Sequence, residues 1–181
     1  IEQMVEEYDL MVIDYPHVGE VSAKGLLQNF DLEKYSNELE LLQKQSVGLS
    51  HQSYNIDGHQ WALALDAATQ VSCYRNDLIT SHPKSWDDLF QLSKNNKVIW
   101  PLKPVHAISS FYSIYNNITE EFQPSNKNFI QKDFGVKTLQ MMKRISQQLP
   151  SECFGMDPIK TAEILSEHNE FFYSPYTYGF S

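Results

Sequence analysis

Residues 54–78 constrain the fold of this chain more than any other stretch. The pair Asp57-Gly58 has the residue types that turn a β-hairpin, because both tolerate the positive φ angles that such a turn needs. A mostly apolar run, 60–65, follows the turn, and a second extended run, 71–74, comes after a set of small residues. The stretch therefore predicts a strand, a turn, a second strand and a further extended segment.

Between the two extended runs lies Asp66, followed by small residues that include Ala68 and Thr69. A buried carboxylate followed by small side chains suits a chain that crosses between two lobes at the floor of a cleft, because bulk there would block closure. We therefore expect residues 1–66 to form part of one lobe and residues 67–181 to form most of a second.

The composition excludes several classes of partner. The chain of 181 residues carries a formal net charge of −9, which does not attract a nucleic-acid backbone or an anionic membrane surface, so no nucleic-acid partner is expected. Apolar residues make up 41% of the chain and aromatic residues 13%, which is enough for a core. No run of roughly 18 apolar residues occurs, so the sequence predicts no transmembrane helix.

Motifs for cofactor, metal and nucleophile chemistry are absent from the sequence. It contains no Gly-x-Gly-x-x-Gly, no P-loop and no Gly-x-Ser-x-Gly. The 6 histidines show no His-x-x-x-His pair and no cysteine at ligand spacing, so we expect neither a metal site nor a cofactor. Cys73 and Cys153 fit neither a zinc site nor a disulfide framework, and we expect free, structural thiols, with a disulfide as the alternative.

The remaining elements alternate between helix and strand. Continuous apolar runs in residues 8–14 and 97–102 predict strands of a sheet that is covered on both faces. Ser85 and the pair Asp157-Pro158 predict helix starts. Further helices are expected at 1–7, 21–27, 31–42, 104–115 and 133–148, a loop-rich segment at 116–131, and a final strand at 170–173. This alternation predicts an α/β fold.

Polar and aromatic side chains gather where the predicted strands end, and ligands of open α/β sheets bind at the carboxyl ends of strands. The loop after residues 8–14 contains Asp14, Tyr15 and His17. An ordinary surface turn punctuated by Pro16 is the alternative explanation of this loop.

Two further strand ends carry candidate ligand-binding side chains. Trp100 and Lys103 place an aromatic ring and a cation where the 97–102 run meets the next helix. Tyr176 and Tyr178 follow the last predicted strand, where an interface covered by other parts of the protein would also account for them. Aromatic rings cover the apolar faces of sugars while polar side chains bind their hydroxyl groups, so a carbohydrate or similar polar solute is a plausible ligand.

Several motifs occur in an order that is typical of one protein family. They are Tyr8-Asp9-Leu10-Met11-Val12-Ile13-Asp14, Gly25-Leu26-Leu27, Tyr74-Arg75-Asn76-Asp77-Leu78, Pro83-Lys84-Ser85-Trp86-Asp87-Asp88-Leu89 and Phe171-Phe172-Tyr173-Ser174-Pro175-Tyr176. In this order and across nearly the whole chain, the sequence resembles the extracellular solute-binding proteins of ABC importers, in particular the carbohydrate-binding group that includes maltose-binding proteins.

The resemblance implies a fold and a function. The fold would be that of a type-II periplasmic binding protein, a two-lobed α/β/α structure with a mixed sheet, here incomplete at both ends. The family's members run to about twice this length and carry a signal sequence, so we expect a piece of an extracytoplasmic protein whose signal sequence lies outside it. The function would be to capture a small polar solute, with a sugar as the leading candidate, and to deliver it to the transmembrane subunits of an ABC permease without covalent chemistry.

The resemblance also assigns roles to particular residues. The loop Asp14-Tyr15-Pro16-His17 lies where the first lobe presents polar side chains to solute, the segment from Asp66 to Thr69 lies at the first crossover between lobes, and Tyr176 lies where sugar-binding members often place a stacking aromatic. Two other classes stay open at this point. One is an enzyme, such as a glycoside hydrolase or a transferase on a two-lobed fold, and the other is the effector-binding module of a regulator.

Overall fold

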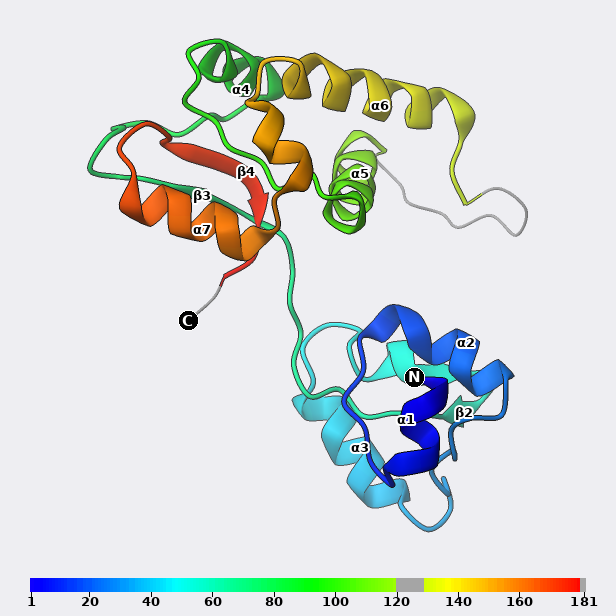
Figure 1. Ribbon diagram of the computed structural model, residues 1–181. Helices are drawn as coiled ribbons and strands as arrows, with labels where there is room; N and C mark the ends of the chain where they lie inside the picture. The colour runs from blue at the N-terminus through cyan, green and yellow to red at the C-terminus, as the bar shows by residue number, and fades with distance from the viewer. Residues whose placement is uncertain (120–128, 180–181) are drawn as a thin grey trace. The chain divides into compact units, whose positions relative to one another are not determined.

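The computed structural model describes residues 1–119 and 129–179 of the chain. The chain forms two compact units, Ile1–Ala67 and Ala68–Ser181, which we call unit 1 and unit 2 and describe separately (Figure 1). Both units contain helices together with short strands, so the expected α/β class is confirmed.

Unit 1 is built around the hairpin that the sequence predicts. Strands β1 (Asn55–Ile56) and β2 (His59–Gln60) pair antiparallel, and the turn residues Asp57 and Gly58 have φ angles of 53° and 78°. Two consecutive positive φ angles are the mark of the tight turn that matches the twist of a hairpin. The strand ends at Gln60, however, so the rest of the apolar run to Leu65 is not part of it. The other elements of unit 1 are α1 (Glu2–Glu7), η1 (Tyr15–His17), α2 (Val18–Ala23), α3 (Ser36–Gln45) and η2 (Gln52–Tyr54).

The strand expected at residues 8–14 does not form. Leu10 is 87% exposed and Val12 is 76% exposed, and the segment has no regular structure. A strand buried on both faces needs neighbouring strands to take its backbone hydrogen bonds and layers to cover its side chains. In residues 1–67 the sheet consists of the hairpin alone, and it does not pair with this segment.

The two helices expected next in unit 1 are displaced from their predicted positions. The first spans Val18–Ala23, ahead of the predicted 21–27. The second begins at Ser36 because Asp31 forms a turn instead: its Oδ1 accepts hydrogen bonds from the backbone N–H groups of Glu33 and Lys34, each at 3.0 Å. An aspartate that bonds its own following backbone competes with helix formation.

Unit 2 contains an antiparallel pair formed by β3 (Val71–Tyr74), which is exposed, and β4 (Tyr173–Thr177) (Figure 1). Helix α7 (Pro158–Glu167) packs against β4, and α6 (Lys132–Ser146) packs against both α4 (Trp86–Ser93) and α5 (Pro104–Ile118). A 3-10 helix, η3 (Ser151–Gly155), precedes α7. Part of the predicted loop-rich segment 116–131 belongs to α5, and its residues 120–128 lie outside the described part of the chain.

Two predicted strands of unit 2 differ from those observed. The last strand was expected at 170–173 but spans Tyr173–Thr177, because pairing with β3 fixes it: Tyr173 lies opposite Tyr74 and Thr177 opposite Val71. The expected strand at 97–102 is reduced to one parallel bridge between Val98 and Tyr173. The sheet expected to be mixed is therefore an antiparallel pair with a single parallel bridge beside it.

Helix starts in unit 2 follow the sequence closely. The Ser85 Oγ accepts a hydrogen bond from the Asp88 N–H at 3.1 Å, and the Asp88 carboxylate accepts one from the Ser85 N–H at 3.0 Å, which completes a capping box at the start of α4. The Asp157 carboxylate accepts a hydrogen bond from the Lys160 N–H at 2.9 Å at the start of α7. Both predicted caps are confirmed.

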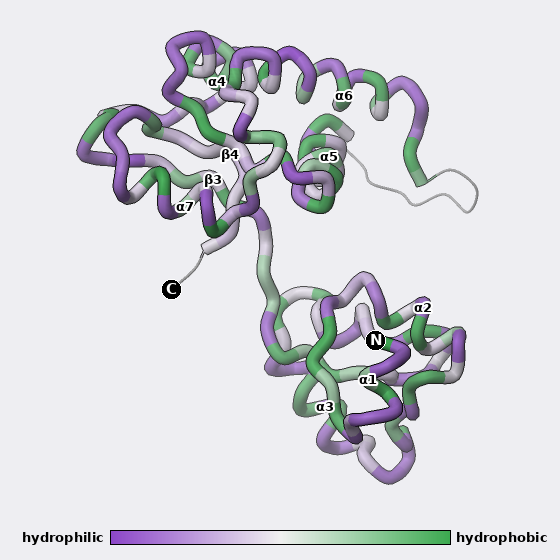
Figure 2. The backbone as a smooth tube through the Cα atoms, viewed as in Figure 1, coloured by the Kyte–Doolittle hydropathy of each residue, from purple (hydrophilic) through white to green (hydrophobic). Residues whose placement is uncertain are grey.

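The hydrophobic core lies in unit 2. Val98, Ile99, Trp100 and Ile114 have no exposed surface, although apolar residues (green) occur in both units (Figure 2). Trp86, Met141 and Met142 are partly buried against this core. Both cysteines are free, Cys73 exposed on β3 and Cys153 buried in the core, where burial raises the pKa of its thiol.

Candidate functional site

Two aromatic rings and two carboxylates form a surface group in unit 1. Tyr15 opens η1 and Tyr54 closes η2, and their rings meet edge to face with centroids 5.7 Å apart. Asp14 immediately precedes η1, and its side chain makes no capping hydrogen bond to that helix. We call Asp14, Tyr15, Tyr54 and Asp66 the tyrosine–aspartate group.

The negative charges of both carboxylates act on the phenol of Tyr54. Burial makes the largest contribution to raising the pKa of Tyr54, and the negative charge of Asp66 adds to it, followed by Tyr15 and Asp14. A nearby negative charge disfavours a phenolate, which is the direction of this shift. The group therefore offers phenol rings as apolar faces and carboxylate oxygens as hydrogen-bond acceptors at one place on the surface of unit 1.

Three of the residues that the sequence predicts as ligand-binding, Asp14, Tyr15 and Asp66, are members of this group. The other predicted residues up to Thr69 lie outside it. His17 is exposed at the end of η1, and Ala68 and Thr69 are exposed at the start of unit 2. Asp66 was expected to be buried but is exposed, as are its neighbours Leu65 and Ala67. Tyr54 was missed by the sequence analysis, although its position just before the hairpin turn could have drawn attention to it.

Unit 2 contributes an aromatic group of its own around Tyr176 in β4. The centroid of its ring lies 6.1 Å from that of Trp86 and 6.1 Å from that of Trp100. The phenol oxygen accepts a hydrogen bond from Asn117 Nδ2 at 3.2 Å. Burial raises the pKa of Tyr176, and the hydrogen bond from Asn117 opposes that rise. Tyr176 is half-buried.

Trp100, in contrast, is a core residue, and the expectation that it contacts a ligand is corrected. Its side chain has no exposed surface, and its indole N–H donates to the Ser110 hydroxyl at 3.1 Å. A contact with solute would require the core to open, because the residues on both sides of it are buried as well. The Trp100 ring lies beside that of Tyr176, tilted by 47°.

The other two predicted residues of unit 2 lie at the ends of elements. Lys103 is exposed immediately before α5, and its backbone N–H donates to the Met156 carbonyl at 3.1 Å. Tyr178 is half-buried just beyond β4. Asp14, Tyr15, His17 and Asp66 belong to unit 1, and Ala68, Thr69, Trp100, Lys103, Tyr176 and Tyr178 belong to unit 2.

A polar network that sequence analysis missed holds the start of unit 2. Gln70 donates from Nε2 to the Ser110 hydroxyl at 3.3 Å and accepts from the Ser113 hydroxyl at 2.8 Å. These bonds fix the residue after Thr69 to α5. No sequence signal could have revealed the network, because Gln70 lies 40 positions from Ser110 and 43 positions from Ser113.

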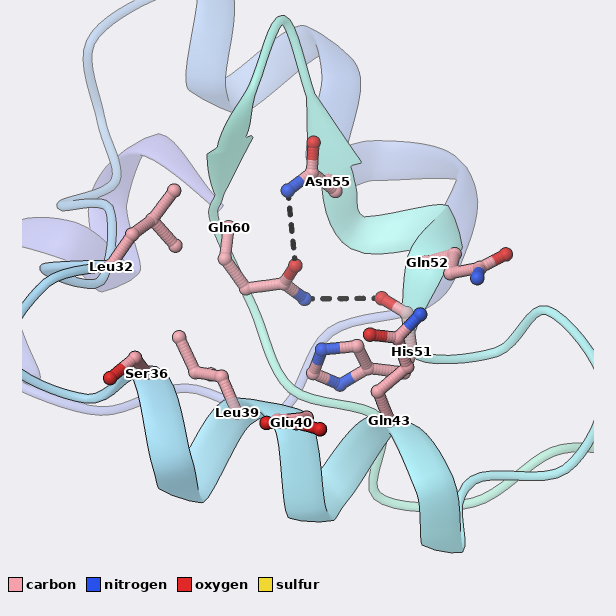
Figure 3. A pocket seen from close by; sticks show the side chains of 9 residues that line it. All are labelled: Leu32, Ser36, Leu39, Glu40, Gln43, His51, Gln52, Asn55 and Gln60. Atoms are coloured by element: carbon pink, nitrogen blue, oxygen red, sulfur yellow. Dashed lines mark hydrogen bonds between the residues drawn. The ribbon is translucent and has the colours of Figure 1, made fainter.

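A cavity of about 520 Å³ opens in unit 1 between α3 and the hairpin (Figure 3). Polar side chains dominate its walls, among them Gln43, His51, Gln52, Asn55 and Gln60. None of the four members of the tyrosine–aspartate group lines it. Sequence analysis did not single out these residues, since they come from a helix, a 3-10 turn and two short strands.

Metal and membrane features are not found in the part of the chain that the structure describes. Among residues 1–119 and 129–179, no group of three or more His, Cys, Asp or Glu side chains is placed to hold a metal ion. No helix in those residues is long and apolar enough to cross a bilayer.

The fold is similar to that of a solved structure, T. maritima MalE3 with maltose bound. The match covers 84% of this chain and 42% of MalE3, with a TM-score of 0.64 and 17% sequence identity. At this identity the likeness concerns the fold alone, and the chain spans less than half the length of MalE3. No family model and no curated protein matches the chain by sequence.

Proposed function

We propose that this chain is part of the solute-binding component of an ABC importer, which captures a sugar outside the cytoplasm and delivers it to a membrane permease. The observation that carries the proposal is the similarity of fold to maltose-bound MalE3 over 84% of the chain. The motif order along the sequence supports the same family, and MalE3 was bound to a sugar in that structure.

The tyrosine–aspartate group supports a sugar as the solute. A sugar has apolar C–H faces and a rim of hydroxyl groups, and the exposed Tyr15 ring can cover the first while Asp14 and Asp66 accept hydrogen bonds from the second. Hydrogen bonds to a charged group contribute about 1.5–3 kcal/mol each, which gives such a site its selectivity. In unit 2 the half-buried Tyr176 offers a further ring.

The proposed mechanism is closure of two lobes on the solute. Residues 1–66 would belong to one lobe and 67–181 to the other, with the segment from Asp66 to Thr69 as the crossover between them. Solute that contacts both lobes binds the closed form more tightly and shifts the population toward it. The closed form would then dock on the permease.

The proposal is tested by measuring the midpoint of thermal unfolding of the full-length protein in the presence of each member of a panel of mono- and oligosaccharides. A ligand that binds only the folded state adds about 2.7 kcal/mol of stability at 100 times its dissociation constant, so binding raises the midpoint clearly. We expect at least one sugar to do so.

Variants then connect that binding to this chain. Asp66→Ala should weaken the affinity about tenfold or more through the lost acceptor, with the thermal midpoint of the unliganded protein little changed. Asp9→Ala, which removes an exposed carboxylate outside the group, is the matched control. Unchanged affinity in Asp66→Ala would contradict its role, and turnover of the sugar that is lost in Asp14→Ala or Asp66→Ala would replace the importer proposal with an enzyme.

A further inference from the structure

An imidazole that has no hydrogen-bond partner among the described residues lines the cavity between α3 and the hairpin. His51 is 7% exposed, and its ring points into the cavity (Figure 3). Its backbone carbonyl accepts a hydrogen bond from Gln60 Nε2 at 3.1 Å, but neither ring nitrogen has a hydrogen bond to any residue that the structure describes. Neither nitrogen is among the fully buried, unpaired side-chain atoms of the described residues, which are His106 Nδ1 and Thr177 Oγ1. The ring nitrogens of His51 therefore face the open space of the cavity and can bind a ligand there.

The opposite wall of the cavity is a rigid amide. Gln60 is 2% exposed, and its Nε2 donates both to the His51 carbonyl and to the Ala62 carbonyl, the second at 2.8 Å. With both donors used, the amide cannot rotate without losing a hydrogen bond. Its Oε1 lies 3.5 Å from Asn55 Nδ2, which leaves it capacity to accept from a ligand.

The charge of the walls restricts the class of ligand. No lysine or arginine lines the cavity, so an anion would enter without a countercharge. The one carboxylate, Glu40, forms an exposed ion pair with Lys44 on the same face of α3, so the charges of the two side chains offset each other at this edge of the cavity. A charged ligand in such a cavity would lose hydration without compensation.

The hydrogen-bonding groups of the walls match hydroxyl groups. A neutral imidazole donates from one nitrogen and accepts at the other, and the amides of Gln43 and Gln52 likewise offer both functions. Each hydroxyl of a ligand also donates and accepts. Leu32 and Leu39 supply apolar surface for C–H groups, and the volume of about 520 Å³ falls in the range typical of small-molecule sites.

We propose that this cavity is a second binding site, which takes a small, neutral, polyhydroxylated compound such as a polyol or a monosaccharide and recognises it through the His51 imidazole. The site lies entirely within unit 1, and it does not depend on the importer function proposed above. Its residues are also distinct from the tyrosine–aspartate group, so the two sites can be tested independently.

The test is nuclear magnetic resonance of the chain with ¹⁵N-labelled histidine, titrated separately with glycerol, myo-inositol and glucose. We expect at least one of these to shift the ring signals of His51 in a saturable manner while those of His82 stay in place. Inorganic phosphate and putrescine serve as charged probes of similar size, and neither should shift His51.

Variants assign the binding to the cavity. His51→Phe should lower the affinity for the bound polyol at least tenfold, while His82→Phe, a matched change in unit 2, should leave it unchanged. Because the loss of a buried histidine could unfold unit 1, Gln43→Ala provides a second test on the exposed side of the cavity, with an expected loss of threefold or more. Asp66→Ala should leave this binding intact, which separates failure of this site from failure of the solute site proposed above.

The proposal is overturned if none of the three polyols shifts the His51 signals, or if only phosphate or putrescine does. It is also overturned if His51→Phe and Gln43→Ala, both folded, bind the polyol as tightly as the unchanged protein.

Discussion

The two units use their apolar residues differently. In unit 2 the segment Val98-Ile99-Trp100 and Ile114 are fully buried, and every member of the main core cluster belongs to this unit. In unit 1 the buried apolar residues are Val18, Val21 and Leu39, while Leu10, Val12, Val47, Leu49 and Leu65 are each more than 70% exposed. Apolar content alone therefore does not tell which part of the chain is packed.

The difference shows what packing requires besides apolar side chains. The unit 2 segment lies beside β4 and shares one core cluster with apolar residues of helices α4, α5, α6 and α7. Residues 8–14 of unit 1 have the same kind of sequence but no neighbouring strand in that unit. We infer that unit 2 supplies most of the chain's stability, whereas unit 1 depends on local turns and supplies the polar sites.

Trp100→Ala tests whether the stability of the chain resides mainly in unit 2, and it has the largest expected effect. Removing a fully buried tryptophan leaves a cavity and should lower the free energy of unfolding of unit 2 by about 3–5 kcal/mol. Amide hydrogen exchange measured along the chain in urea reports each unit separately.

The matched control for that change is Trp61→Ala, since Trp61 is only half-buried in unit 1. It should leave protection of unit 2 amides unchanged. Equal loss of protection in both units on Trp100→Ala would show that the two units do not differ in the way described.

Gly58→Ala tests whether the hairpin turn stabilises unit 1. The φ angle of 78° at Gly58 is unfavourable for a residue with a Cβ, so alanine should destabilise unit 1 by about 1–2 kcal/mol, although no atom lies within 4 Å of the added group. The measurement is the protection of unit 1 amides against hydrogen exchange.

Gly19→Ala serves as the control in the same unit. Gly19 lies in α2, where an added Cβ would meet only the Ile56 Cδ1 at 3.8 Å, and alanine is the better helix former. It should leave unit 1 as stable or slightly more stable. Loss of stability in Gly19→Ala as large as in Gly58→Ala would argue against the backbone explanation.

Ser85→Ala should have a smaller effect, confined to unit 2. It removes the side-chain acceptor for the Asp88 N–H and should cost about 1 kcal/mol of the free energy of unfolding. Urea denaturation followed by circular dichroism measures it, with Ser81→Ala in the loop before α4 as the control. An effect no larger than that of the control would mean that the core alone fixes α4.

Asp66→Asn should have the smallest effect, a fall in the pKa of Tyr54. Burial is the larger cause of the raised pKa and remains, so the pKa should fall only part of the way toward the ordinary value of 10.0. Because the pKa is raised in the folded state, neutral Tyr54 contributes to the stability of the fold below pH 10. This contribution is lost as the pH rises through the raised pKa of the folded state.

Titration of ¹³C-labelled tyrosine followed by nuclear magnetic resonance measures that pKa. Asp9→Asn is the control for the loss of one negative charge elsewhere in unit 1. A Tyr54 titration that is identical in Asp66→Asn and the unchanged protein would contradict the proximity of the two side chains.

Local chemistry in the sequence predicted the turn and the caps because these depend on neighbouring residues alone. Asp57-Gly58, Ser85 and Asp157 each act on backbone groups within three positions of themselves, and all three behave as expected. The tyrosine–aspartate group was found in part, since Asp14 and Asp66 stood out at the ends of apolar runs while Tyr54 did not.

Only the tertiary structure decided which apolar runs became core and which polar residues came together. Residues 8–14 and 97–102 looked alike as sequences, and the presence of β4 beside the second made the difference. Trp100 became a core residue for the same reason, and the cavity around His51 arose where a helix and a hairpin meet. Caps and turns are short-range interactions that a sequence displays, whereas burial depends on partners distant in the chain, which only the folded structure supplies.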